Sequence, residues 1–129
     1  MKNLNRLYWL KHEKTQIENQ ITELTVLSAV SMSGMPSGST VSSPVEKFHE
    51  RLEKLTEKLQ RKCAEILIET ERIEDYIENI EDAEVRVIAR KRFIENKTFQ
   101  TIGDELYIEK TTAYKKLKRY LERTEENEA

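Results

Sequence analysis

Apolar residues recur every three or four positions along most of this chain, which is the spacing of one buried helix face. Two long runs cover residues 4–28 and 45–80. Three shorter runs follow in residues 81–95, 99–106 and 110–121. The pattern therefore predicts an all-α protein, with an elongated helical hairpin of coiled-coil type in front and a group of short helices behind.

The run over residues 45–80 predicts one helix of about 36 residues, or about 54 Å at about 1.5 Å per residue. Its apolar face consists of Phe48, Leu52, Leu55, Leu59, Cys63, Ile66, Ile73, Ile77 and Ile80. The run over residues 4–28 is shorter, and Lys14 interrupts its face, so it covers only part of the longer helix. We expect a homodimer through residues 45–80. The alternative is a helix that bends near residues 69–71 and folds back on the C-terminal part.

Residues 29–44 contain almost no charge, two of the three Gly, both Pro and six Ser. This composition predicts a loop, either a plain connector between antiparallel helices or a peptide that folds on a partner. The following helix begins with a clear signal, because Ser43 is suited to the N-cap, Pro44 to the first helical position and Glu46 to the third. The sequence thus predicts a helical hairpin or oligomerisation region over residues 1–80.

Residues 81–124 predict a separate module of three helices. Its first helix, over residues 81–95, has Asp82 as N-cap and a core face of Val85, Ile88, Ala89 and Phe93. The next two apolar faces consist of Phe99, Ile102 and Leu106 and of Ala113, Leu117 and Leu121. The three-residue connection Tyr107-Ile108-Glu109 has the length of the turn in a helix-turn-helix. Gly103 suits close packing within this motif, and Glu109 suits the N-cap of the last helix.

The last helix carries donors for phosphates and base edges away from its apolar face. These candidate DNA-binding residues are Lys110, Thr111, Thr112, Tyr114, Lys115, Lys118 and Arg119. Further candidates for phosphate contacts are Arg86, Arg90, Lys91, Arg92, Lys97 and Thr98. The alternative is a helical hairpin whose basic face is merely solvated.

The distribution of charge favours nucleic acid over plain solvation. Residues 86–123 hold eleven Lys or Arg against five Asp or Glu, a balance of +6. Because the whole chain totals −2, the remaining residues carry −8. Such an asymmetry indicates a basic module that meets a polyanion, attached to an acidic part that does not.

Several short sequence motifs in the C-terminal part resemble those of a known family. The order begins with an Arg-rich helix over residues 85–93 and a short segment over residues 94–98. Two motifs follow, Ile102-Gly103-Asp104-Glu105-Leu106 and Thr112-Ala113-Tyr114-Lys115. From about Ala83 to Arg123, this order resembles region four of sigma-70-type factors, the helix-turn-helix that reads a promoter element. One departure is Glu109, which stands where that pattern has Ser and puts an anion near the DNA backbone.

The layout of the whole chain, with its long helical front and its Ser/Gly/Pro break, resembles the small phage-encoded late transcription regulators of the RinA/ArpU type. The resemblance implies activation of genes in prophages or mobile elements of Gram-positive bacteria. Together with the basic module, it predicts a sequence-specific regulator that binds double-stranded DNA as a homodimer, with RNA polymerase as a possible further partner. The alternative is a protein-interaction module, an anti-activator or scaffold, that binds polymerase or a sigma factor without a DNA site.

Composition argues against other classes of function. A single Cys cannot form a disulfide framework and indicates a reduced, cytoplasmic setting. His12 and His49 lack Cys neighbours at ligand spacing, so we expect no metal site and no cofactor. There is no Gly-rich phosphate loop, no activated nucleophile and no apolar run long enough for a membrane span. The sequence therefore gives no reason to expect an enzyme.

Overall fold

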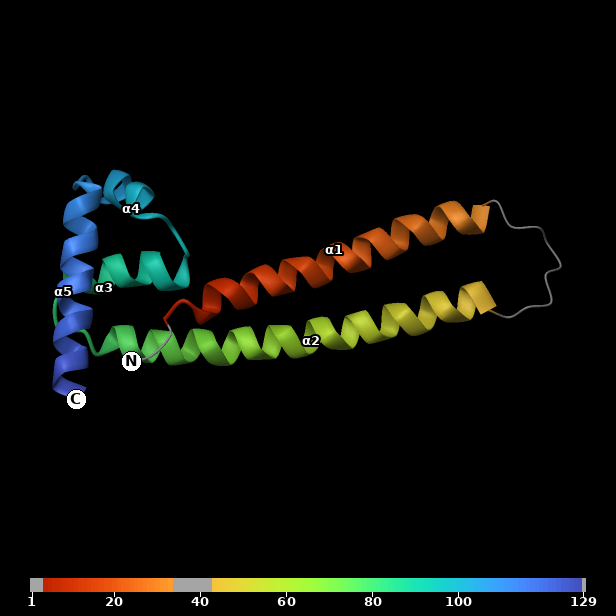
Figure 1. Cartoon of the computed structure of the whole chain (residues 1–129), viewed down its shortest axis with the longest axis horizontal. Coiled ribbons are helices and arrows are strands. Elements are labelled where there is room, and N and C mark those ends of the chain that lie inside the picture. Colours follow the sequence, from red (N-terminus) through yellow and green to blue (C-terminus); the bar gives the residue numbers. More distant parts are fainter. Residues whose placement is uncertain (1–3, 34–42, 129) are drawn as a thin grey trace. The chain divides into compact units, whose positions relative to one another are not determined.

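The computed structural model describes residues 4–33 and 43–128, with side chains over residues 4–29 and 44–125. These residues form helices and no strand, so the predicted all-α fold is confirmed (Figure 1). The elements are α1 (Arg6–Ser33), α2 (Ser43–Glu78), α3 (Ala83–Ala89), the π-helical segment η1 (Arg90–Ile94), α4 (Phe99–Leu106) and α5 (Lys110–Glu128). Within the described ranges, no helix is both long and apolar enough to cross a membrane.

The ends of the two long helices differ slightly from the prediction. α1 continues to Ser33, so the connection that was predicted to begin at residue 29 begins later. The interior of that connection and the proposed cap by the Ser43 side chain lie outside the described residues. α2 has 36 residues and stays α-helical through residues 69–71, where a bend was the alternative.

The chain divides into two compact units. One is Leu10–Ile66, and the other combines Met1–Trp9 with Leu67–Ala129, of which residues 4–9 and 67–128 are described. The division falls inside α1 and α2 rather than near residue 80, where the sequence placed it. The C-terminal helices therefore share one unit with the beginning of α1 and the last turns of α2, and we call it the C-terminal unit.

The unit Leu10–Ile66 is a helical hairpin in which α1 and α2 lie side by side and run in opposite directions (Figure 1). Leu10, Ile17 and Leu55 are buried along it. An ion pair joins the two helices, with Lys62 Nζ 3.6 Å from Glu13 Oε2. Cys63, which the sequence placed on the apolar face, is exposed. The face passes through Lys62 instead, because Leu55, Leu59, Lys62 and Ile66 keep the spacing of four, three and four residues that one helix face requires.

The C-terminal unit has the larger core. Its buried apolar side chains are Leu4, Leu7, Ile73, Ile77, Ile80, Val85, Ile88, Ala89, Phe93, Ile102, Ala113 and Leu117. All four residues predicted for the core face of α3 and η1 are among them. Asp82 is the N-cap of α3, as predicted: its carboxylate accepts from the backbone N–H of Glu84 at 2.8 Å. η1 is a wider turn, in which Glu95 N–H donates to the Arg90 carbonyl five residues back.

Ile73 was predicted to take part in a dimer interface, and this prediction is wrong. Its side chain is completely buried within the C-terminal unit, as is that of Ile77. The end of the long apolar stripe is thus covered by the chain's own residues. The large apolar side chains that α2 leaves exposed are those of Val45, Leu67 and Ile68.

A buried carboxylate interrupts this stripe. Glu69 is only 1% exposed and occupies a position on the core face of α2. Arg6 Nη1 donates to its Oε2 at 3.0 Å, and Arg72 Nε donates to its Oε1 at 2.9 Å. The hydrogen bond from Arg72 is the main cause that holds the pKa of Glu69 below the ordinary value of 4.5, against the opposing effect of burial. Glu69 thereby fixes the beginning of α1 to α2 within the C-terminal unit.

Glu69→Gln should lower the free energy of unfolding of this unit by about 1–3 kcal/mol at pH 7, because it removes the acceptor charge for two guanidinium groups. The pKa of Glu69 is lowered by folding, so its contribution is present above about pH 4.5 and is lost as the pH falls through the folded-state value. The variant and the original chain should therefore converge in stability as the pH falls through the folded-state pKa of Glu69. Urea unfolding followed by the emission of Trp9, which lies in the same unit, measures the effect.

The matched control is Glu18→Gln. Its carboxylate lies 3.9 Å from Lys14 Nζ in an exposed pair on α1. An exposed pair contributes little, so this variant should change the free energy by less than about 0.5 kcal/mol. Equal losses for the two variants would contradict the role assigned to Glu69.

Candidate nucleic-acid interface

The turn between α4 and α5 is held together at Gly103. The carbonyl of Gly103 accepts from the backbone N–H of Tyr107 and, at 3.0 Å, from that of Ile108. A Cβ atom at this position would stand 2.7 Å from the Ile108 carbonyl oxygen and 3.1 Å from the Lys110 nitrogen. A side chain there would force the turn backbone to move. The predicted close packing at Gly103 is thus found, and its partner is the backbone of the turn.

α4, the three-residue turn and α5 follow one another in the order of a helix-turn-helix. Ala113 and Leu117 of α5 are buried, and Lys115 lies about half a helical turn away from their common direction. Six of the seven predicted DNA-binding residues are exposed: Lys110, Thr111, Tyr114, Lys115, Lys118 and Arg119. Thr112 is half-buried on the core side, so it is less accessible to a ligand than the sequence suggested.

Tyr114 connects the beginnings of the two helices. Its side chain is 46% exposed, and its ring meets the ring of Phe99 edge to face, with centroids 5.3 Å apart. Lys118 Nζ lies 5.6 Å from the centroid of the Tyr114 ring. The ring is thus held on one side by α4 and presents the other side beside a cation.

Lys116 differs from its basic neighbours on α5. It is half-buried, and its Nζ donates to Glu84 Oε1 of α3 at 2.7 Å. It is not among the DNA-binding residues predicted from the sequence, and its position one residue before Leu117 places it near the core side of α5. It braces the three-helix module rather than lying on the exposed basic face.

Two of the predicted phosphate contacts instead support the fold. Arg86 Nη1 donates to the Ile80 carbonyl at 2.7 Å and so ties α3 to the connection that follows α2. Arg90 Nη2 donates to Glu78 Oε1 at 3.1 Å. These guanidinium groups fasten α2 to the helices that follow it.

A compact ionic cluster lies beside α4. Glu105 accepts from Lys91 Nζ at 2.6 Å and from Lys97 Nζ at 2.7 Å, and Lys97 also pairs with Glu95 at 2.9 Å. The hydrogen bond that Lys91 donates is the main cause that lowers the pKa of Glu105. The hydrogen bond that Lys97 donates to Glu105 is the main cause that raises the pKa of Lys97. A carboxylate of the same chain thus already faces both lysines.

Arg92 and Thr98 have a different environment at the beginning of α4. Arg92 Nη1 donates to the Lys97 carbonyl at 3.1 Å, and its guanidinium carbon lies 4.6 Å from the centroid of the Phe99 ring. These described contacts are with a carbonyl and a ring rather than with a carboxylate. Thr98 is the N-cap of α4, since its hydroxyl accepts from the Thr101 N–H at 3.2 Å. Both residues thus lie where α4 presents its free N–H groups.

Nothing among the described side chains resembles a metal site. They include no group of three or more His, Cys, Asp or Glu residues placed to hold an ion. His12 and His49 are both exposed, on α1 and α2.

Fold and candidate interface define a class: an all-α chain with a long helical hairpin and a module of short helices whose last member carries an exposed basic face. The family model described as protein of unknown function DUF1492 matches residues 38–125. The chain therefore belongs to the DUF1492 family. No curated protein and no solved structure matches it.

Tyr107 is a feature that the sequence analysis treated only as part of the turn. It ends α4 in the left-handed conformation, with φ 57°, and its side chain is 95% exposed. Gly or Asn usually occupies such a position, because other side chains are strained there. The signal in the sequence for this strained position was a large residue where a helix usually ends in Gly or Asn.

Tyr107→Asn should raise the free energy of unfolding by about 0.5–1 kcal/mol, because Asn adopts the left-handed conformation at lower cost and no packed contact is lost. The comparison is Tyr114→Asn, which removes a ring contact from within α5 and should lower stability. Urea unfolding of both variants measures the difference. A loss of stability on changing Tyr107 would show that its conformation is not strained.

Proposed function

We propose that the protein is a sequence-specific DNA-binding regulator of transcription, and that it activates phage or mobile-element genes. The observation that carries the proposal is the exposed face of α5. The first ten residues of this helix, residues 110–119, hold five Lys or Arg and no acidic residue, and four of the five are exposed. DUF1492 is a phage-associated family, which supports the biological setting.

In this proposal α5 enters the major groove, where the first turns of the second helix of a helix-turn-helix meet base edges. Thr111 and Lys115 lie on the exposed face within these turns, with Tyr114 at its edge. Lys118 and Arg119 follow about one turn later and are placed for phosphates. Each phosphate that a cation neutralises releases counterions, so the non-specific part of the affinity falls steeply with salt.

The same proposal divides the other basic residues into two groups. Arg86 and Arg90 hold the fold together, so we no longer assign them to phosphates. Lys91 and Lys97 are paired with Glu105 at exposed or half-buried positions, where an ion pair exchanges at small cost. They become phosphate contacts only if DNA displaces Glu105. Arg92 and Thr98 remain the better candidates at the beginning of α4.

The second candidate function is a protein-interaction module that binds polymerase or a sigma factor without a DNA site. The exposed apolar residues Leu67 and Ile68, at 62% and 67%, favour some contact with protein. Gel-shift binding to genomic fragments at two salt concentrations separates the candidates. A DNA reader keeps a preferred site after non-specific binding is removed by salt, whereas an interaction module keeps none.

We also propose that the chain is a homodimer, and we move the interface from Ile73 to the exposed part of α2 at Leu67 and Ile68. The occupant is a second copy of the chain, because two copies can bind two half-sites and gain affinity without new DNA contacts. A two-fold interface also lets the same apolar pair meet itself.

Lys115→Ala should weaken binding to the preferred site by about 1–3 kcal/mol and binding to random DNA by much less, because Lys115 lies where base edges are read. Competition gel shifts with both kinds of DNA measure the ratio. The matched control is Lys116→Ala, which removes the same charge from the core side of α5 and should leave the ratio unchanged. Equal loss on all sequences would instead make Lys115 a phosphate contact.

Leu67→Asp together with Ile68→Asp should convert the dimer into a monomer while leaving the helix content unchanged, because both side chains are exposed within one chain. Light scattering at micromolar concentration should give twice the 15.3 kDa of one chain before the substitutions and about that mass after them. A mass of one chain for the original protein would contradict the dimer.

A further inference from the structure

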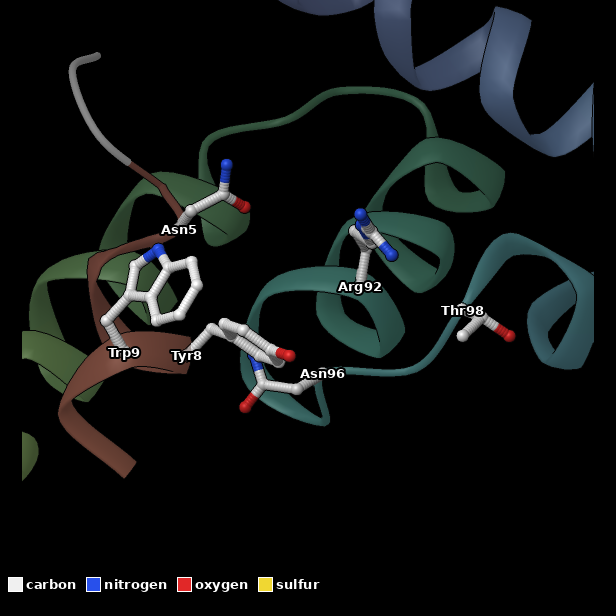
Figure 2. A pocket seen from close by; sticks show the side chains of 6 residues that line it. All are labelled: Asn5, Tyr8, Trp9, Arg92, Asn96 and Thr98. Atoms are coloured by element: carbon white, nitrogen blue, oxygen red, sulfur yellow. The ribbon is translucent and has the colours of Figure 1, made fainter. Parts of the chain in front are cut away.

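A pocket of about 430 Å³ opens between the beginning of α1 and the segment around η1 in the C-terminal unit (Figure 2). Asn5, Tyr8 and Trp9 line one side, and Arg92, Asn96 and Thr98 line the other. Figure 2 shows Tyr8 directed toward Asn96, while Arg92 lies across the opening from Trp9. Among these residues, only Arg92 and Thr98 were predicted from the sequence to contact a ligand.

The chemistry of the lining suits a phosphodiester and its sugar. Arg92 is the only charged residue among the six, and none of them is acidic. Its guanidinium is fixed by the Lys97 carbonyl and the Phe99 ring, which leaves most of its five N–H donors for a phosphate. Thr98 and Asn5 add a hydroxyl and an amide at the edge.

The aromatic side of the pocket is unusual for its exposure. Trp9 is 62% exposed and Tyr8 is 39% exposed, and their rings meet edge to face with centroids 5.0 Å apart. Folding leaves much of this apolar area in water. Such rings provide a flat surface against which a deoxyribose can pack, while the polar groups opposite hold the phosphate.

The pocket adjoins the proposed DNA-binding face. A second hollow, of about 260 Å³, shares Asn5 and Arg92 with it and is also lined by Tyr114 and Lys118 of α5. The two hollows thus form one continuous surface that runs from Trp9 past Arg92 to α5, the proposed recognition helix. Glu122 and Glu125 also line this second hollow, and Glu122 Oε1 lies 3.9 Å from Lys118 Nζ, so the positive character is strongest near Arg92.

We propose that the pocket between the beginning of α1 and Arg92 holds the sugar–phosphate backbone of the DNA, so that Asn5, Tyr8 and Trp9 extend the interface beyond the helix-turn-helix. The inference rests on the proposed DNA-binding function. An acidic protein segment is the competing occupant. DNA is favoured because the pocket continues into the basic face of α5, where a duplex would already lie.

Trp9 is the single Trp of the chain, so its emission reports the state of this pocket. The intact protein is titrated with a labelled duplex of about two helical turns, long enough for the recognition helix and the flanking backbone. The anisotropy of the label measures binding, and the Trp9 emission is followed in parallel. The expected result is that both signals change over the same range of DNA concentration, and that a poly-glutamate peptide leaves the emission unchanged.

Two variants sharpen the test. Trp9→Ala should weaken binding by about five- to tenfold, as loss of a packed aromatic contact does, with an unchanged salt dependence because no charge is removed. Arg92→Gln should weaken binding too, but unlike Trp9→Ala it should reduce the slope of log affinity against log salt by about one, as loss of one phosphate contact does. The matched control is Leu27→Ala: Leu27 is 59% exposed on α1 in the other unit and should not affect binding.

The outcomes are distinguishable. If the anisotropy reports binding while Trp9 emission and the affinity of Trp9→Ala stay unchanged, the pocket is not part of the DNA interface and only this inference is overturned. If the peptide changes the emission and DNA does not, the pocket is a protein-docking site, which also overturns it. If no duplex binds at any salt concentration, the proposed function and this inference are overturned together.

Discussion

The candidate interface depends on the absence of a side chain at Gly103. A Cβ atom there would stand 2.7 Å from the Ile108 carbonyl oxygen, so only Gly lets the turn lie this close to α4 without moving. The closeness lets the Gly103 carbonyl accept from Ile108 N–H at 3.0 Å, and it sets the direction in which α5 begins. Burial of Ala113 and Leu117 then fixes the rotation of α5 about its axis. Because the direction and the rotation of α5 are both fixed, its basic side faces away from the core.

A second interaction supports this module from the other end of the chain. Buried Glu69 binds Arg6 and Arg72, which attaches the beginning of α1 to α2 inside the C-terminal unit. The same attachment brings Tyr8 and Trp9 beside Arg92. A hydrophobic residue at position 69 would also fill the core, but it could not accept the hydrogen bond that Arg6 donates to Glu69. The carboxylate thus specifies which residues of α1 lie there, at the cost of burying a charge.

Hydrophobic periodicity was sufficient to predict the helices and most of the core. It identified Val85, Ile102, Ala113 and Leu117 as buried, because apolar residues at helical spacing have few alternatives. It failed where a charged residue occupies the core face. Lys62 and Glu69 occupy positions on the apolar face of α2. Their aliphatic stems pack there and their charges are paired, but a count of apolar residues does not include them. The neighbouring Cys63 was therefore assigned to the face in error, and a bend near residues 69–71 was left as an alternative where α2 continues.

The sequence predicted the net charge of the module, but not which of its cations pair with carboxylates of the same chain. A balance of +6 over residues 86–123 indicates a polyanion as partner, yet it does not show which cations the chain itself engages. Pairing depends on contacts across the fold, such as Lys91 with Glu105 fourteen residues away or Lys116 with Glu84 thirty-two away. Such pairs cost a ligand little to exchange when they are exposed, but they still reduce the attraction that each lysine offers. The strongest attraction for an anion therefore comes from cations without a nearby carboxylate. By this criterion Lys115 and Arg92 are better placed than the lysines around Glu105, although the sequence alone did not distinguish Arg92 from those lysines.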